Sequence, residues 1–135
     1  MTSQIVYKGD LRTEAQHLPS GTIIETDAPK DNQGKGERFS PTDLVATALG
    51  SCMLSIMGIA ARTHAIDIVE TKIDIEKIMI ADPMRRIAEI KVEFHFPVGK
   101  DYSDKEKTIL EKAALTCPVY LSLHENTKKS VVFNW

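Results

Sequence analysis

The stretch that decides the fold is FSPTDLVATALGSCMLSIMGIAAR, residues 39–62. Ser40, Pro41 and Asp43 have the pattern of a helix start, because a serine cap, a first-turn proline and an acidic residue three positions after the cap suit the free N–H groups there. Large apolar residues then recur at helical spacing, at Leu44/Val45, Leu49, Met53, Ile56/Met57 and Ala60. We therefore predict one helix from Pro41 to about His64 with a buried apolar stripe.

This helix contains an uncharged run of 18 residues, from Leu44 to Ala61, which reaches the lower limit for a membrane span. Thr47, Ser51 and Ser55 interrupt the run, and the segments on both sides alternate like the strands of a soluble sheet. We interpret it as a helix buried on nearly all sides by protein, with no membrane partner. A chain of 135 residues can hardly cover such a helix alone, so we expect a homodimer.

Composition supports one domain over residues 1–135, with 42% hydrophobic residues and a net charge of −2. No segment concentrates basic residues into a stripe that could follow a phosphate backbone, so we expect no nucleic-acid partner. The N-terminal segment lacks the basic and then apolar regions of a secretory signal, which predicts a cytoplasmic protein. In the cytoplasm the two cysteines should be thiols at rest.

The remaining sequence predicts strands on both sides of the long helix. Residues 4–27 have turn signals at 9–10 and 19–21 and predict an N-terminal meander, followed by a polar, mobile loop over 28–37. Residues 69–80 and 88–96 alternate and predict an antiparallel hairpin, with a bulge near Glu76 and Lys77.

A second amphipathic helix is predicted after a cap at Ser103, with Ile109, Ala113 and Cys117 on its inner side. Pro118 interrupts it, a short helix follows, and residues 130–135 predict a last strand. This order of elements indicates an α+β fold.

Cys52 and Cys117 are the only cysteines, and each falls on the apolar side of a predicted helix. They are either small buried hydrophobic residues or a redox pair. Neither has a second cysteine or a histidine at the short spacing that zinc sites use, so we predict no metal. His64 lies twelve residues after Cys52, roughly 18 Å along the same helix, and cannot serve as its base within that helix.

The segment SPTDLVATALGSCM, followed later by TCPV, resembles the OsmC/Ohr family of osmotically induced and organic hydroperoxide resistance proteins. In that family the first cysteine lies on a central helix and the second lies in a Cys-Pro motif. The resemblance implies an OsmC-like α+β fold, in which antiparallel sheets wrap around long central helices in an intertwined homodimer.

The resemblance also implies a function and the residues that perform it. Cys52 would attack an organic hydroperoxide as a thiolate and become a sulfenic acid, and Cys117 would then form a disulfide with it. A dithiol reductant, carried by lipoylated proteins in the better-known members, would restore both thiols. No cofactor is implied.

Burial alone raises a thiol pKa, so this mechanism requires a nearby positive charge. The resemblance places it at Arg12, with Arg38 as the fallback. In the family a glutamate that follows the helix-start proline holds the arginine, but that position is Thr42 here. Either the next residue, Asp43, replaces the glutamate, or Arg12 is held differently, or the activity is altered. The alternative function is a non-catalytic, stress-related or small-ligand-binding domain with inherited cysteines.

Overall fold

The chain begins with a three-stranded antiparallel sheet, formed by β1 (Ser3–Gly9), β2 (Arg12–His17) and β3 (Ile23–Asp27). The structure is a computed structural model that describes residues 1–135. Gly9 has a φ of 88° and Gly21 a φ of 74°, so each turn uses a backbone conformation that glycine tolerates best. The predicted meander and both of its turns are confirmed.

The chain falls into two compact units, Met1–Val45 and Ala46–Trp135. The first unit holds the meander, the loop after it and the first residues of the long helix α1 (Pro41–His64). The second unit holds the rest of α1, a second sheet and two shorter helices.

The loop predicted over residues 28–37 is present, and it is folded back on itself. It contains a short 3-10 helix, η1 (Lys30–Asn32), and its backbone is closed by a bond from Gly34 N–H to the Pro29 carbonyl at 3.0 Å. Gly36 N–H also donates to the Ala28 carbonyl at 3.2 Å. Polar composition predicted a loop here, and these local hydrogen bonds close it on itself.

Helix α1 begins and ends where the sequence predicted. Asp43 N–H donates to Ser40 Oγ at 3.1 Å and Ser40 N–H donates to Asp43 Oδ2 at 2.8 Å, which completes the capping box. The predicted stripe is confirmed at Leu49, Met53 and Met57, which have no exposed surface. Val45 is 38% exposed, so the stripe is narrower than predicted.

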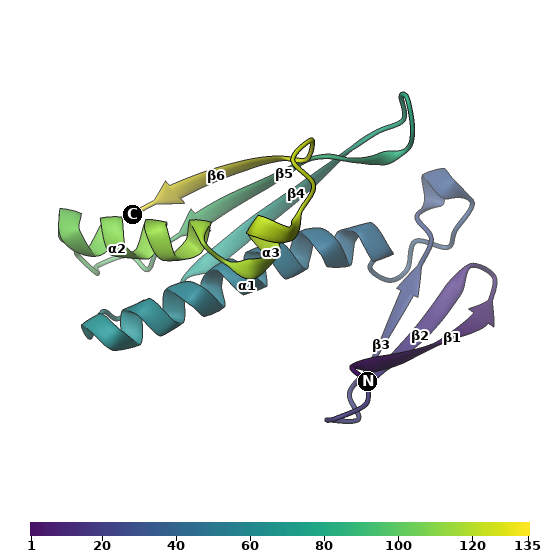
Figure 1. The fold of residues 1–135 in the computed structure, drawn as a ribbon, viewed down its shortest axis with the longest axis horizontal. Coiled ribbons are helices and arrows are strands. Elements are labelled where there is room, and N and C mark those ends of the chain that lie inside the picture. The colour runs from purple at the N-terminus through teal and green to yellow at the C-terminus, as the bar shows by residue number, and fades with distance from the viewer. The chain divides into compact units, whose positions relative to one another are not determined.

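In the second unit, α1, α2 (Asp104–Leu115) and α3 (Pro118–Ser122) cover one face of a sheet (Figure 1). The sheet has the order β4 (Lys72–Ile80), β5 (Arg86–His95) and β6 (Lys128–Asn134). Strands β4 and β5 form the predicted antiparallel hairpin, whereas β6 pairs with β5 in parallel. The helices between β5 and β6 act as a crossover that allows parallel pairing, so the expectation of antiparallel sheets holds for all pairs except this one.

Two details of this unit differ from the sequence prediction. The register shift in β4 lies between Ile78 and Met79, two residues later than predicted. The fully buried residues of α2 are Leu110 and Ala114, one position after the predicted Ile109 and Ala113. The sequence pattern predicted both elements, but it misplaced the register shift of β4 by two residues and the buried face of α2 by one.

By length and composition α1 could also span a membrane, since its most apolar 18-residue window has a mean hydropathy of 1.9. A third of that window, 33%, is buried within the chain. Core helices of soluble proteins meet the same criterion.

An added Cβ at Gly50 would lie 2.8 Å from Ile75 Cδ1, so α1 approaches β4 closely at this glycine.

Candidate active site

Cys52 lies at the middle of α1, next to the buried stripe rather than within it. Its side chain is half-buried and packs against the core, whereas Met53, the next residue, is fully buried. A cysteine at the edge of a buried stripe keeps access to solvent while it is fixed by its helix. This is the exposure that a nucleophilic thiol needs.

Cys117 occupies the junction between α2 and α3. The sequence placed it on the inner side of a helix, but α2 ends at Leu115 and Cys117 is the N-cap of α3, directly before Pro118. Its Sγ accepts a hydrogen bond from the Tyr120 N–H at 3.3 Å, and the residue has no exposed surface. Proline at the first helical position suits this geometry because it has no N–H to satisfy.

The two thiols are free, and their side chains interact with each other. Burial is the main cause of a raised pKa for Cys117, and the contact with Cys52 raises it further. The Tyr120 N–H acts in the opposite direction, because it favours the thiolate. Cys117 is therefore a buried thiol with a raised pKa, and Cys52 is the cysteine that is accessible to solvent.

Arg12 is the first residue of β2 and lies opposite Asp27, the last residue of β3. Its Nε donates to Asp27 Oδ1 at 2.7 Å, and its Nη2 donates to Asp27 Oδ2 at 2.8 Å. Nη2 also donates to Glu37 Oε2 at 2.9 Å. The Arg12 side chain is 20% exposed, so the guanidinium is held within its sheet rather than extended into solvent.

This ion pair dominates the electrostatics of the first unit. The hydrogen bonds from Arg12 lower the pKa of Asp27 to about 2, although burial of the carboxyl acts to raise it. The same bonds raise the pKa of Arg12 well above its ordinary value. Because the mutual hydrogen bonds outweigh burial, both groups keep their charges at any physiological pH, although Asp27 is only 1% exposed.

The other predicted residues lie elsewhere. Asp43 uses its carboxylate in the capping box of α1, and Thr42 Oγ1 lies 3.1 Å from Ser40 Oγ. Arg38, the fallback arginine, donates from Nε to Glu25 Oε2 at 2.9 Å, and its side chain is 46% exposed. Of the two arginines, Arg12 is therefore the one with a buried carboxylate as its partner.

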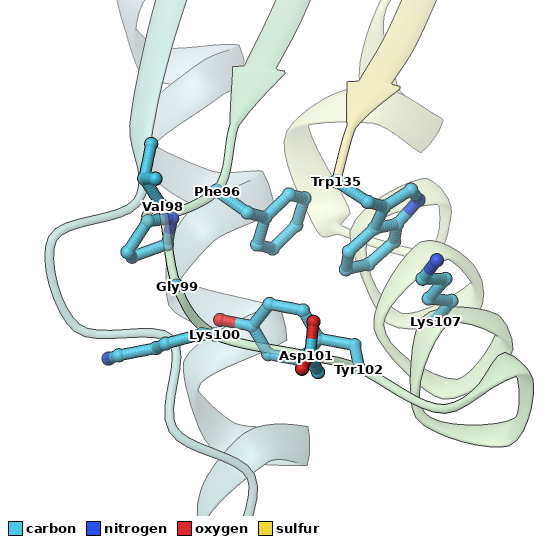
Figure 2. Close-up of a pocket in the computed structure, with 9 residues that line it drawn as sticks. Phe96, Val98, Gly99, Lys100, Asp101, Tyr102, Lys107 and Trp135 are labelled. Atoms are coloured by element: carbon cyan, nitrogen blue, oxygen red, sulfur yellow. The ribbon is translucent and has the colours of Figure 1, made fainter.

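Other clusters give weaker candidates. No group of three histidine, cysteine or acidic side chains is placed to hold a metal ion. A hollow of about 340 Å³ lies beside the aromatic cluster of Phe96, Tyr102 and Trp135 (Figure 2). Tyr102 Oη donates to the Asp67 carbonyl at 2.8 Å and the Lys107 ammonium lies 5.6 Å from the Trp135 ring centre, so these groups stabilise the end of the sheet. No cysteine lines this hollow.

The sequence profile of the OsmC-like protein family matches residues 34–131 of this chain. The chain belongs to the OsmC-like family. A solved structure from Psychrobacter arcticus 273-4, of a candidate osmotic stress induced and detoxification response protein, is 50% identical to it. That comparison has a TM-score of 0.93 and covers 99% of this chain and 96% of the other.

More distant OsmC and Ohr structures have the same fold. The organic hydroperoxide resistance protein OsmC of Legionella pneumophila is 15% identical, with a TM-score of 0.78 over 100% of this chain and 98% of its own. A candidate organic hydroperoxide resistance protein of Vibrio cholerae, solved with captopril in one of its active sites, is 14% identical. It gives a TM-score of 0.75 over 99% of this chain and 92% of its own. No significant match was found among curated proteins.

Two residues of the Arg12 cluster, Asp27 and Glu37, were not predicted from the sequence. One signal was available for Asp27. The turn centred between Pro19 and Ser20 is equally distant in sequence from Arg12 and Asp27, and a hairpin pairs residues at equal distances from its centre. Glu37 lies in the loop, and the sequence carries no comparable signal for its position.

Proposed function

We propose that this OsmC-like protein reduces organic hydroperoxides with Cys52 as the peroxidatic thiol and Cys117 as the resolving thiol. The observation that carries the proposal is the unequal thiol pair, in which a half-buried Cys52 contacts a fully buried Cys117. Family membership and a 50% identical neighbour with a candidate detoxification role support the same function.

In the first step the Cys52 thiolate attacks the terminal oxygen of the hydroperoxide. The S–O bond forms as the O–O bond breaks, so sulfur loses two electrons and becomes a sulfenic acid. The leaving alkoxide takes a proton from water and departs as an alcohol. The half-buried position of Cys52 suits this step, because an apolar organic peroxide can reach the sulfur from solvent.

In the second step the Cys117 sulfur attacks the sulfur of the Cys52 sulfenic acid. An S–S bond forms, the S–O bond breaks, and the oxygen leaves as water with the thiol proton. Cys117 needs no access to solvent for this, since its partner is already in contact. A dithiol reductant then returns both sulfurs to thiols by exchange, and a lipoylated protein is the kind of donor we propose.

Arg12 is the proposed activating charge for Cys52, and the proposed assembly is a homodimer. The hydrogen bonds that Arg12 donates to Asp27 and Glu37 hold its guanidinium in one orientation. The dimer is supported by large apolar side chains left exposed in one chain, among them Ile5, Tyr7, Ile23 and Ile59, each more than half exposed.

The test is stopped-flow oxidation of the reduced protein by cumene hydroperoxide and, separately, by hydrogen peroxide. The free thiols of the protein and the mass of its oxidised product are measured in each case. We expect the organic peroxide to oxidise both thiols to a disulfide much faster than it oxidises a free thiol. Cys52→Ser should abolish this oxidation, and Cys117→Ser should leave Cys52 over-oxidised. Oxidation no faster than that of a free thiol, with no disulfide, would exclude the peroxidase and favour the ligand-binding alternative.

A further inference from the structure

Asp27 is the most deeply buried charged side chain of the first unit, at 1% exposed. A buried carboxylate is costly unless it is paired and hydrogen-bonded. Here Arg12 supplies the opposite charge, and the Glu37 N–H donates to Asp27 Oδ2 at 3.1 Å. The backbone is fixed as well, since Asp27 N–H donates to the Phe39 carbonyl at 3.2 Å. Asp27 is therefore held from both its side chain and its main chain.

The pairing between Asp27 and Arg12 fixes the plane of the guanidinium. Two parallel N–H···O bonds, of 2.7 and 2.8 Å, join Nε and Nη2 to the two carboxylate oxygens. Bonds of this bidentate kind restrict direction as well as distance. Nη1 takes no part in them, so its N–H groups remain as donors for a reacting group.

We propose that Asp27 is the positioning residue of Arg12 in the hydroperoxide reaction, in the place that a glutamate at position 42 would otherwise fill. The proposal rests on the proposed function. Thr42 has no charge with which to hold an arginine, and Asp43 uses its carboxylate to cap α1. Asp27 acts through Arg12, as a positioning residue rather than a catalytic one.

Glu37 provides a matched comparison within the same cluster. It makes one bond to the Arg12 side chain, at 2.9 Å, and its own side chain is 61% exposed. Removing a negative charge beside Arg12 leaves more positive potential there, which favours a nearby thiolate. If an acidic residue acted only through its charge, its removal would speed the oxidation of Cys52. If it acts by holding Arg12 in place, its removal would slow that oxidation. The sign of the effect separates the two explanations.

The experiment compares the wild type with Asp27→Asn, Glu37→Gln, Arg12→Gln and the Asp27→Asn/Arg12→Gln double variant. For each protein, the rate constant for oxidation of Cys52 by cumene hydroperoxide is measured. We expect Asp27→Asn to lower it about tenfold or more, the effect of a misplaced reacting group. Glu37→Gln should leave it within about twofold or raise it, because its charge effect acts in the opposite direction. The double variant should be no slower than Arg12→Gln alone, since Asp27 acts only through Arg12.

A second readout measures the hold on Arg12 directly. The Arg12 Nε–H resonance, assigned from its loss in Arg12→Gln, should exchange slowly with water in the wild type and rapidly in Asp27→Asn. Circular dichroism confirms that each variant is folded. Asp27→Asn oxidation as fast as that of Glu37→Gln, or additive losses in the double variant, would overturn the proposal while the peroxidase stands. A wild type that reacts no faster than a free thiol would overturn both.

Discussion

Cys52 is half-buried and Cys117 is fully buried, yet their side chains interact with each other. Burial raises the pKa of Cys117 and keeps it as a thiol, so it can neither meet a peroxide first nor compete with Cys52 for one. The order of the proposed steps follows from this difference in exposure. In the proposed order, the accessible Cys52 reacts first with the peroxide, and the buried Cys117 then reacts with the Cys52 sulfenic acid.

The first prediction concerns the reactivity of the two thiols. We expect iodoacetamide to alkylate Cys52 several-fold faster than Cys117 in the folded protein at pH 7 to 8, because Cys117 is buried and its burial raises its pKa. Mass spectrometry of peptides after timed quenching gives both rates. In denaturant the two rates should converge. Faster labelling of Cys117 in the folded state would contradict the assignment of the resolving thiol.

Sequence patterns were sufficient to predict most helices and strands, because each of these elements has its own local sequence signals. The capping box of Ser40 and Asp43 predicted the start of α1, and the alternation from Ile90 to Phe94 predicted the buried face of β5. The cluster around Arg12 was not predictable in the same way. It depends on strand register and on how the loop folds, and both are set by contacts between residues far apart in sequence. Glu37, 25 positions from Arg12, is the clearest example.

The second prediction concerns the acid stability of the first unit. The folded-state pKa of Asp27 is about 2, below its ordinary unfolded value of about 3.9. The pair therefore stabilises the fold fully above about pH 4, and this stabilisation is lost as the pH falls toward 2. Asp27→Asn should remove this part of the pH dependence. Urea unfolding followed by circular dichroism at several pH values measures it, and an unchanged pH profile in Asp27→Asn would contradict the assignment.

The third prediction concerns Gly34 in the loop that carries Glu37. A Cβ added at this position would overlap the Ala28 carbonyl, which is backbone and cannot rotate away. Gly34→Ala should therefore lower the free energy of unfolding by about 1–3 kcal/mol. Because the loop also places Glu37 beside Arg12, the Arg12 Nε–H resonance should shift as well.

Gly58→Ala is the matched control for Gly34→Ala. Gly58 lies inside α1, and an added Cβ meets nothing within 4 Å there. Alanine is the better helix former by about 1 kcal/mol, so this variant should be as stable as the wild type or more stable. Equal losses in both variants would mean that the loop closure at Gly34 is not the cause.

The last prediction tests the proposed homodimer at Ile59. This residue is 61% exposed and lies seven positions after Cys52, so the two side chains share one face of α1. If a second copy covers that face, Ile59→Lys places a charge in the interface, and light scattering should give the mass of a monomer. Val98→Lys is the control, because Val98 is fully exposed in a loop and should leave the dimer intact. A wild type that is monomeric at all concentrations would exclude the dimer, and dissociation by both variants would exclude this face of α1 as its specific site.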